Sequence, residues 1–342
     1  MSRRKKEICK VVIGTVLLTA VLLMTFAMFH HVLPRMRALK NRQEIPVTAQ
    51  TPAPVTTPDP TPEPEATPEP TAEPEDLRTE WQKKFEEHFT EQVEITGRSY
   101  HSPDLSIDIT EHTGDFSAGQ TTYYVADIYV GSVENFGACL AGDQFCLYYK
   151  EPIEQIAEEH NALLSINGDF YSYQLSDEYS VTVRNGEVYR TGPLSIADIC
   201  VLFEDGTMET YGYGEYTTDA LLEQGVRHIW HFGPRLLLSD GSINTNYNVQ
   251  VAITYPNPRT AVGYFEPGHY CFLVADGRQE TSAGLRLDEL GQIMKDLGCV
   301  SAYNLDGGGS TVMYFNGEKV NHQSNGGDRD CGDILYIAES IG

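Results

Sequence analysis

The sequence predicts an α+β domain with a mixed or antiparallel sheet, several hairpins and a few packing helices, preceded by one transmembrane helix. The hairpins are indicated by Asn-Gly between alternating runs at 181–190 and 312–320, and by Asp-Gly at 201–211 and 236–243. These dipeptides favour the positive φ angles of tight hairpin turns. Because few helical stretches interrupt the strand-like runs, the α+β class follows.

Three helices are expected around the sheet. One begins at Pro152, where the missing N–H of proline leaves no hydrogen bond unmade. Another ends at Gly298, a residue suited to a helix C-terminus. Its apolar face consists of Leu287, Leu290, Ile293, Met294 and Leu297. Upstream, residues 77–100 carry an apolar side chain at every fourth position from Leu77 to Val93, which predicts a lead-in amphipathic helix that docks onto the domain.

The first 76 residues are predicted to lie outside the folded domain. The uncharged run Val11 to Phe29 would cover roughly 28 Å as a helix, enough to cross a bilayer. It is longer than a typical signal-peptide core, and no A-x-A cleavage site follows it. We therefore expect a single-pass type II protein of the cell membrane, with its large domain extracellular. The expected segments are a cytoplasmic tail (1–10), a signal-anchor (11–33), a Pro/Thr/Glu-rich disordered linker (34–76), the lead-in helix (77–100) and the main domain (101–342).

Charge and cysteine content narrow the classes of partner. The +7 of the first 45 residues and the −7 of residues 46–76 cancel, so residues 77–342 carry the whole net charge of −25. Such acidity argues against binding nucleic acid or anionic membrane surfaces.

Six cysteines follow the anchor, an even number that permits up to three disulfides, and Cys139 and Cys146 could close a small loop. No N-x-S/T sequon is present, which favours a bacterial origin. Nothing indicates an oligomeric state.

Polar residues cluster at the ends of four apolar, strand-like runs. Strand ends held by a packed sheet are common places for a functional site. Taken singly, each group is also compatible with a turn, since Asp-Gly and Gly-rich segments adopt turns readily. Together they form the candidate site: Asn167, Gly168 and Asp169; Arg259 and Thr260; Asp276 and Arg278; and Asn304 and Asp306 with Gly307, Gly308, Gly309 and Ser310.

Five segments, four of which carry these groups, resemble the phosphodiester glycosidase family: "NLDGGGST", "PRTAVG", "ADGRQ", "ING-DF" and "FGPRLLLSDG". They occur in the family's order across roughly residues 160–340. The resemblance implies a hydrolase that cleaves the sugar–oxygen bond of a sugar-1-phosphodiester, here a GlcNAc-1-phosphodiester-like unit of envelope or exopolysaccharide glycan. The C-terminal segment "NHQSNGGDRDCGDILYI" resembles the family's closing loop and brings Arg329 into the candidate set.

The resemblance also implies roles. Asp306 is expected to be the carboxylate that stabilises the cationic transition state, as base toward water or as nucleophile. Arg259, Arg278 and the N–H groups of the glycine segment are expected to bind phosphate, because guanidinium forks and consecutive N–H groups suit phosphate oxygens. Asn167 and Asn304 are expected to bind sugar hydroxyls. Asp276 is expected to hold an arginine or serve as a second carboxylate. Asp169 departs from the family, where a small residue is common, and is either an extra carboxylate or a turn residue.

Three alternatives remain open from the residues. A Ca²⁺ or Mg²⁺ ion could be held by Asp306, Asp276 and Asp169, although no D-x-D-x-D-G spacing is present and we expect no required cofactor. The domain could be a non-catalytic glycan-binding or exopolysaccharide-assembly module. It could also be a metal-dependent phosphodiesterase that cleaves P–O rather than C–O.

Overall fold

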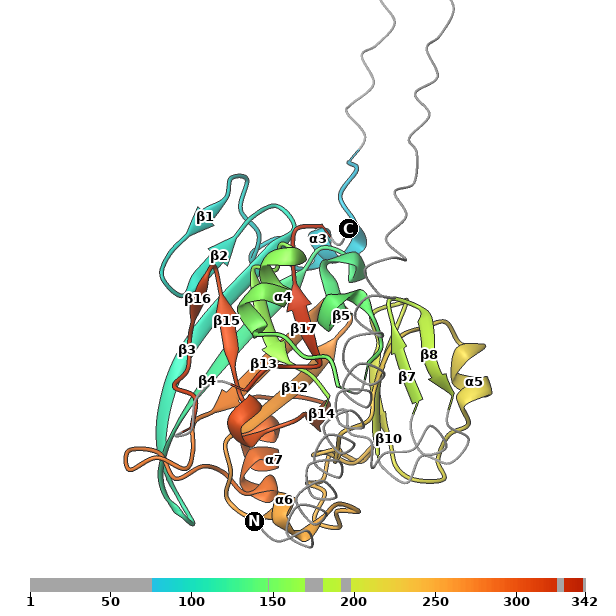
Figure 1. Ribbon diagram of the computed structural model, residues 1–342. Coiled ribbons are helices and arrows are strands. Elements are labelled where there is room, and N and C mark those ends of the chain that lie inside the picture. Colours follow the sequence, from blue (N-terminus) through green and yellow to red (C-terminus); the bar gives the residue numbers. More distant parts are fainter. Residues whose placement is uncertain (1–75, 147, 170–180, 192–197, 325–328, 341–342) are drawn as a thin grey trace, which may run out of the picture. The chain divides into compact units, whose positions relative to one another are not determined.

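The computed structural model describes residues 76–146, 148–169, 181–191, 198–324 and 329–340 (Figure 1). In these residues the strands form three sheets, and every strand pairing is antiparallel. The predicted α+β class is therefore confirmed. The expected membrane anchor lies outside the described residues, among which no helix is both long and apolar enough to cross a membrane.

The largest sheet has seven strands and contains the longest hairpin of the structure. Its first four strands follow chain order, and the last three come from the C-terminal part of the chain. In spatial order they are β1 (Glu94–Ile95), β2 (Ser99–His101), β3 (Leu105–Phe116), β4 (Gly119–Val130), β13 (His269–Ala275), β12 (Arg259–Glu266) and β14 (Ser301–Asn304).

The other two sheets have five strands each. The second sheet consists of β10 (Met208–Tyr211), β9 (Ile199–Phe203), β11 (Val226–Trp230), β7 (Val181–Arg184) and β8 (Glu187–Thr191). The third consists of β16 (Glu318–Lys319), β15 (Met313–Phe315), β6 (Leu164–Asn167), β17 (Asp333–Ile337) and β5 (Phe136–Leu140).

Helices are short and few in the described residues. They are α3 (Glu80–Lys84), α4 (Ile153–Glu159), α5 (Thr218–Leu222), α6 (Val251–Thr254) and α7 (Leu287–Asp296), with 3-10 turns at Val133–Asn135, Ala141–Asp143 and Gly308–Ser310. Pro152 caps α4, and α7 is followed by Gly298 with a φ of 95°, so both predicted helix boundaries are confirmed. Only glycine adopts that φ without strain.

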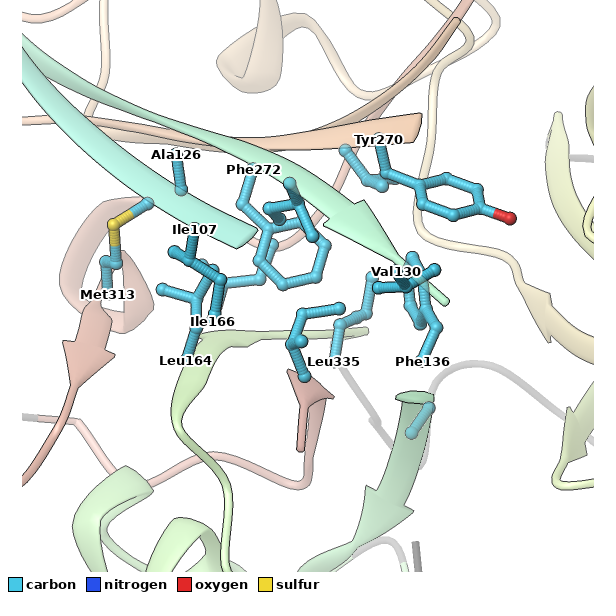
Figure 2. Packing of buried hydrophobic residues seen from close by; sticks show 14 of the residues in the cluster. Ile107, Ala126, Val130, Phe136, Leu164, Ile166, Tyr270, Phe272, Met313 and Leu335 are labelled. Carbon is cyan, nitrogen blue, oxygen red and sulfur yellow. The ribbon is translucent and has the colours of Figure 1, made fainter. Parts of the chain in front are cut away.

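One core lies between the sheets, because the strands alternate their side chains between two faces. Figure 2 shows Ile107 and Phe272 of the first sheet pointing toward Ile166 and Leu335 of the third. Trp230 of the second sheet belongs to the same cluster. The opposite face of the first sheet is covered by α7, that of the second sheet by α5 and that of the third sheet by α4. Burying each large apolar side chain contributes roughly 1.5–3 kcal/mol, so this shared core fixes the three sheets together.

The hairpins predicted at the two Asn-Gly dipeptides and at 201–211 form, whereas residues 236–243 form only an isolated bridge between Leu237 and Ile243. Asn185-Gly186 joins β7 to β8 and Asn316-Gly317 joins β15 to β16, all four residues with positive φ. Asparagine and glycine tolerate that region, which explains their selection in these two-residue turns.

Two expectations of local structure are wrong. The lead-in helix does not extend over 77–100: α3 spans only Glu80–Lys84, after which Phe85 is buried and Val93 is exposed. A short helix suffices to pack Trp81 against the main core and to place Phe85 where it is buried. The six cysteines of residues 77–342 are free thiols, so the possible bridge between Cys139 and Cys146 does not form.

The topology brings the predicted site segments to one place. Because β12 runs antiparallel to both neighbours, its first residue, Arg259, pairs with Ala275 at the end of β13. Two residues further on, Ala261 pairs with Asn304 at the end of β14. The end of β6 reaches the same place through a hydrogen bond from Asp306 N to Gly168 O, 3.1 Å long.

Candidate active site

Asp306 lies at the centre of the candidate site, in the loop that follows β14. Its side chain is buried, with 8% of the residue exposed. One carboxylate oxygen accepts from the backbone N–H of Gly307 at 2.8 Å, and the other accepts from Arg329 Nη2 at 2.9 Å. Burial raises the pKa of Asp306 above its ordinary value, while Arg329 acts in the opposite direction. A carboxylate held in this way can act as a base or nucleophile once it is ionised.

The end of β6 fixes the backbone around Asp306. Asn167 donates from Nδ2 to the carbonyl of Asp306 at 2.7 Å, and its Oδ1 accepts from Thr260 Oγ1 at 2.7 Å and from the N–H of Val312 at 3.2 Å. Asn167 and Thr260 are fully buried. Their side chains therefore position the Asp306 loop, rather than contacting sugar hydroxyls as expected for Asn167.

A pocket of about 190 Å³ opens beside Asp306. Its lining combines three arginines with one aromatic ring and three apolar side chains. The lining residues are Phe232, Ala252, Ile253, Asn257, Pro258, Arg259, Arg278, Asp306, Gly307, Gly308 and Arg329. Three cations beside a single carboxylate give this pocket a positive balance within an otherwise acidic chain, as an anion site requires.

Arg259 is a buried cation held by carbonyl groups. It donates to the carbonyls of Leu285, Ile253 and Tyr255 at 2.9, 2.6 and 2.7 Å, and no described carboxylate forms an ion pair with it. Burial lowers its pKa to about 10, so it remains charged at neutral pH. A buried charge without a counter-ion is costly. An anion entering the pocket would supply the missing charge.

Arg278 and Arg329 occupy other parts of the lining. Arg278 is exposed and is held by Asn257 Oδ1, which accepts from its Nε at 3.2 Å and its Nη2 at 2.6 Å. Its φ of 58° is unusual for a residue other than glycine. Arg329 bridges the Asp306 loop, donating from Nε to Ser310 Oγ at 2.6 Å as well as from Nη2 to Asp306.

The glycine segment differs from the expected anion nest. The N–H of Gly307 donates to Asp306, that of Gly308 donates to Pro258 O, and that of Ser310 donates to Gly307 O. These N–H groups are therefore used within the loop. Close approach explains the glycines better: a Cβ at Gly307 would lie 2.7 Å from Pro258 O. At Gly308, φ is 65° and a Cβ would lie 3.1 Å from Arg278 Nη1, whereas at Gly309 the nearest atom would be 3.8 Å away.

The other expected carboxylates lie in separate environments. Asp276 accepts from Asn321 Nδ2 at 3.2 Å and from the N–H of His322 at 3.1 Å, and burial raises its pKa. Among the described residues its ion-pair partner is His322 and not an arginine, so the expectation that it holds an arginine is wrong. Asp169 is buried against Arg184 and His231.

These separate partners also bear on the metal alternative. Among the described residues no group of three or more His, Cys, Asp and Glu side chains could hold a metal ion. Asp306, Asp276 and Asp169 thus do not form the ligand set considered from the sequence.

Asn304 serves the fold more than the pocket. It is fully buried and donates from Nδ2 to Gly233 O at 2.8 Å, which ties the end of β14 to the segment after β11. It does not line the pocket beside Asp306, so the expected contact with a sugar hydroxyl has no support in this geometry. Phe170 and Tyr171, two aromatic residues of the sequence that could stack on a sugar face, lie outside the described residues.

Sequence reasoning missed Phe232, Asn257 and the buried ionic residues Arg184 and Asp333. Phe232 lies within the segment "FGPRLLLSDG" but had no assigned role. Arg184 and Asp333 are charged residues in otherwise apolar strands, and both are fully buried. That pattern is a usable signal, because charges are rarely buried unless they are paired.

Comparisons with known proteins agree with this architecture. Residues 160–338 match the family described as phosphodiester glycosidase. The SPbeta prophage-derived uncharacterized protein YomE of Bacillus subtilis (strain 168) is 27% identical over 192 residues, which cover 55% of this chain and 30% of that protein. The N-acetylglucosamine-1-phosphodiester alpha-N-acetylglucosaminidase of Bos taurus is 36% identical over 199 residues, covering 54% of this chain and 36% of that protein.

A solved structure extends the similarity to the fold. The zebrafish N-acetylglucosamine-1-phosphodiester alpha-N-acetylglucosaminidase catalytic domain, auto-inhibited by its pro-peptide, superposes with a TM-score of 0.59 at 21% identity. The match covers 72% of this chain and 88% of that one. The aligned region spans about a third of the length of the two curated relatives above.

Proposed function

Because the chain belongs to the phosphodiester glycosidase family, we propose that it is a hydrolase that cleaves the glycosidic C–O bond of a sugar-1-phosphodiester. The observation that carries the proposal is one buried carboxylate, Asp306, lining the same pocket as Arg259, Arg278 and Arg329. Glycosidic cleavage passes through an oxocarbenium-like transition state that a carboxylate stabilises. The departing group is a phosphomonoester, and the arginines suit its developing charge.

The bonding changes balance with water as the only co-substrate. The electron pair of the C–O bond leaves with the phosphate oxygen, and the oxygen of water becomes the new hydroxyl on the anomeric carbon. Asp306 takes the proton from water in a single step, or first bonds to carbon and is released by water. Because the second pKa of a phosphomonoester is about 6, the leaving group needs little protonation. A second carboxylic acid beside Asp306 is therefore not essential.

The pocket favours binding of the phosphate close to Arg259 and Arg278. Arg259 supplies a fixed charge from the interior, and Arg278 supplies donors from the exposed side. Phe232 gives the pocket an aromatic surface for the apolar face of a sugar ring.

The substrate we propose is a GlcNAc-1-phosphodiester-like unit of envelope or exopolysaccharide glycan. Residues 11–33 would anchor the enzyme and residues 34–76 would extend the domain outward. Protease added to intact cells should remove a C-terminal tag and spare an N-terminal one; the opposite pattern would reverse the orientation.

The pH dependence of turnover should report the burial of Asp306. As base or nucleophile the side chain must be ionised, and burial raises its pKa above the ordinary 3.8. We therefore expect kcat/KM to rise with pH along a limb centred above 3.8. Replacing Arg329 with glutamine should move this limb to still higher pH, because Arg329 lowers the pKa of Asp306. A limb at or below the ordinary value in wild type, or a downward move in the variant, would contradict ionised Asp306 as the active form.

Two substitutions of Arg278 separate the effect of its charge from the effect of its backbone conformation. Arg278→Ala and Arg278→Gly should both reduce kcat/KM by about tenfold or more, since each removes a charged donor of phosphate. Arg278→Gly should be more stable than Arg278→Ala by about 1 kcal/mol, because glycine adopts a φ of 58° without strain. Steady-state kinetics and thermal melting measure the two effects. Wild-type kcat/KM in both variants would remove Arg278 from the phosphate site.

A further inference from the structure

A buried ionic cluster lies behind the pocket. Arg184 donates from Nη2 to Asp169 Oδ2 at 3.1 Å and to Asp333 Oδ2 at 2.6 Å, and from Nε to the same Asp333 oxygen at 3.2 Å. The side chains of both aspartates are 0% exposed and that of Arg184 is 1% exposed. His231 adds a ring nitrogen 3.1 Å from Asp169 Oδ2. We call Arg184, Asp169 and Asp333 the Arg184 cluster.

Stability alone is a weak reason for such a cluster. The desolvation of buried charges offsets much of their attraction, so apolar replacements of similar volume are often tolerated. Burial opposes ionisation of Asp169, yet His231 and Arg184 hold its pKa at about 2, so the charges persist. What the cluster does supply is geometry, because a guanidinium that contacts two carboxylates fixes both of them.

Asp333 connects the cluster to Asp306. The N–H of Gly168 donates to the carbonyl of Asp333 at 3.1 Å, and the N–H of Asp306 donates to the carbonyl of Gly168 at 3.1 Å. A Cβ at Gly168 would lie 2.5 Å from Asp333 Oδ1, so the two residues are packed as closely as a glycine allows. The position of Asp333 is thereby transmitted to the backbone of the proposed catalytic residue.

Asp169 connects the cluster to the facing side of the pocket. Its carboxylate accepts the backbone N–H of His231 at 3.1 Å and that of Phe232 at 3.0 Å. Phe232 and Asp306 both line the pocket. Asp169 thus holds the backbone of Phe232 through its carboxylate. Asp333 holds the backbone of Asp306 through its carbonyl group and Gly168.

We propose that Arg184 is a positioning residue that sets the placement of Asp306 relative to Phe232, and so the placement of the bound sugar relative to the catalytic carboxylate. This rests on the proposed function for its kinetic consequence. It assigns Asp169 to the same task, in place of the extra carboxylate or turn residue considered from the sequence. A misplacement of about 1 Å can reduce turnover by about 100-fold without removing a catalytic group.

The test compares two buried arginines, Arg184 and Arg227, in the full-length protein. Arg184→Lys keeps a positive charge but cannot contact both carboxylates as a fork does. Arg227→Lys is the matched control, because Arg227 is also buried and contacts the two carboxylates of Glu134 and Glu204, none of which lines the pocket. Arg184→Lys should lose more stability, because its two carboxylates are 0% exposed whereas those of Glu134 and Glu204 are 66% and 50% exposed. Only Arg184→Lys should lower kcat, by about 10- to 100-fold, with KM changed less than about threefold.

A second measurement does not depend on activity. Amide hydrogen exchange of Asp306 and Phe232 should accelerate at least about tenfold in Arg184→Lys and stay at the wild-type rate in Arg227→Lys, because these two amides bond to groups that the cluster holds. Asp169→Asn, which keeps one acceptor oxygen, should accelerate the amide exchange of Phe232. This variant replaces Arg184→Lys in the test if Arg184→Lys does not fold. Equal kcat and equal exchange in the two lysine variants would overturn the proposal. If wild type shows no turnover, the proposed function fails and the exchange rates alone decide the positioning role.

Discussion

Asp306→Asn should abolish turnover while the domain stays folded. The amide keeps the size and much of the hydrogen bonding of the carboxylate but cannot take a proton from water or bond to an anomeric carbon. Loss of a group in this role reduces kcat by roughly 10³-fold or more. Steady-state kinetics with a sugar-1-phosphodiester measures the loss, and circular dichroism checks the fold. Turnover within about tenfold of wild type would remove Asp306 from the chemistry.

The same substitution, Asp306→Asn, should not lower the stability of the domain. Burial raises the folded-state pKa of Asp306, so ionising it costs folding free energy as pH rises through that pKa. Asparagine has no such cost. At neutral pH we therefore expect Asp306→Asn to melt no lower than wild type, with any advantage shrinking as pH falls through the raised pKa and lost by about pH 3, where the carboxyl is protonated in both states. Melting curves at the two pH values test this sign; a variant that melts far below wild type at neutral pH contradicts it.

Gly307→Ala should be the most damaging single-methyl change in the loop. The new Cβ would lie 2.7 Å from the carbonyl oxygen of Pro258, a backbone atom that cannot rotate away. We expect a loss of about 2–3 kcal/mol in unfolding free energy, together with a fall of about 100-fold in kcat because Asp306 is the adjacent residue. Denaturant unfolding and kinetics on the folded protein give the two values.

Gly309→Ala is the matched control. It adds the same methyl group two residues away, where the nearest atom would be 3.8 Å distant and φ is not in the left-handed region. Its stability and kcat should stay within about 0.5 kcal/mol and about threefold of wild type. If the two variants behave alike, close packing against Pro258 is not the reason for glycine at 307.

The sequence placed the right segments at the site because strand ends and their polar residues are local patterns. Asp306, Arg259, Arg278 and Arg329 all line one pocket, as the resemblance implied. The hairpin dipeptides also predicted the antiparallel pairings, since their turn geometry is set by two adjacent residues.

The roles of the buried polar residues depended on distant partners. Asn167 resembled a sugar-binding residue, yet its partners are the backbone of Asp306 and Val312 and the hydroxyl of Thr260. The nearest of these in sequence is 93 positions away. Asp169 likewise meets Arg184 only once the second and third sheets pack together. A pattern within a short segment carries no information on such pairs.

The lead-in helix failed for a different reason. The stripe from Leu77 to Val93 has helical spacing, but an isolated helix of that length gains stability mainly from packing. Trp81 and Phe85 pack against the body of the domain, while Leu77 stays 87% exposed, Val93 is exposed and the chain turns toward β1. Tertiary contacts therefore ended the helix at Lys84.

Isotope labelling shows whether the enzyme breaks the C–O or the P–O bond of its substrate. The protein is incubated with UDP-GlcNAc in ¹⁸O-water, with and without chelator, and the nucleotide product is followed by the isotope shift of its phosphorus resonances. Free GlcNAc in the same water corrects for exchange at the anomeric carbon, and Asp306→Asn serves as the inactive control. We predict one ¹⁸O in the released sugar and none in the phosphate. Label in the phosphate would mean P–O cleavage and would contradict the account.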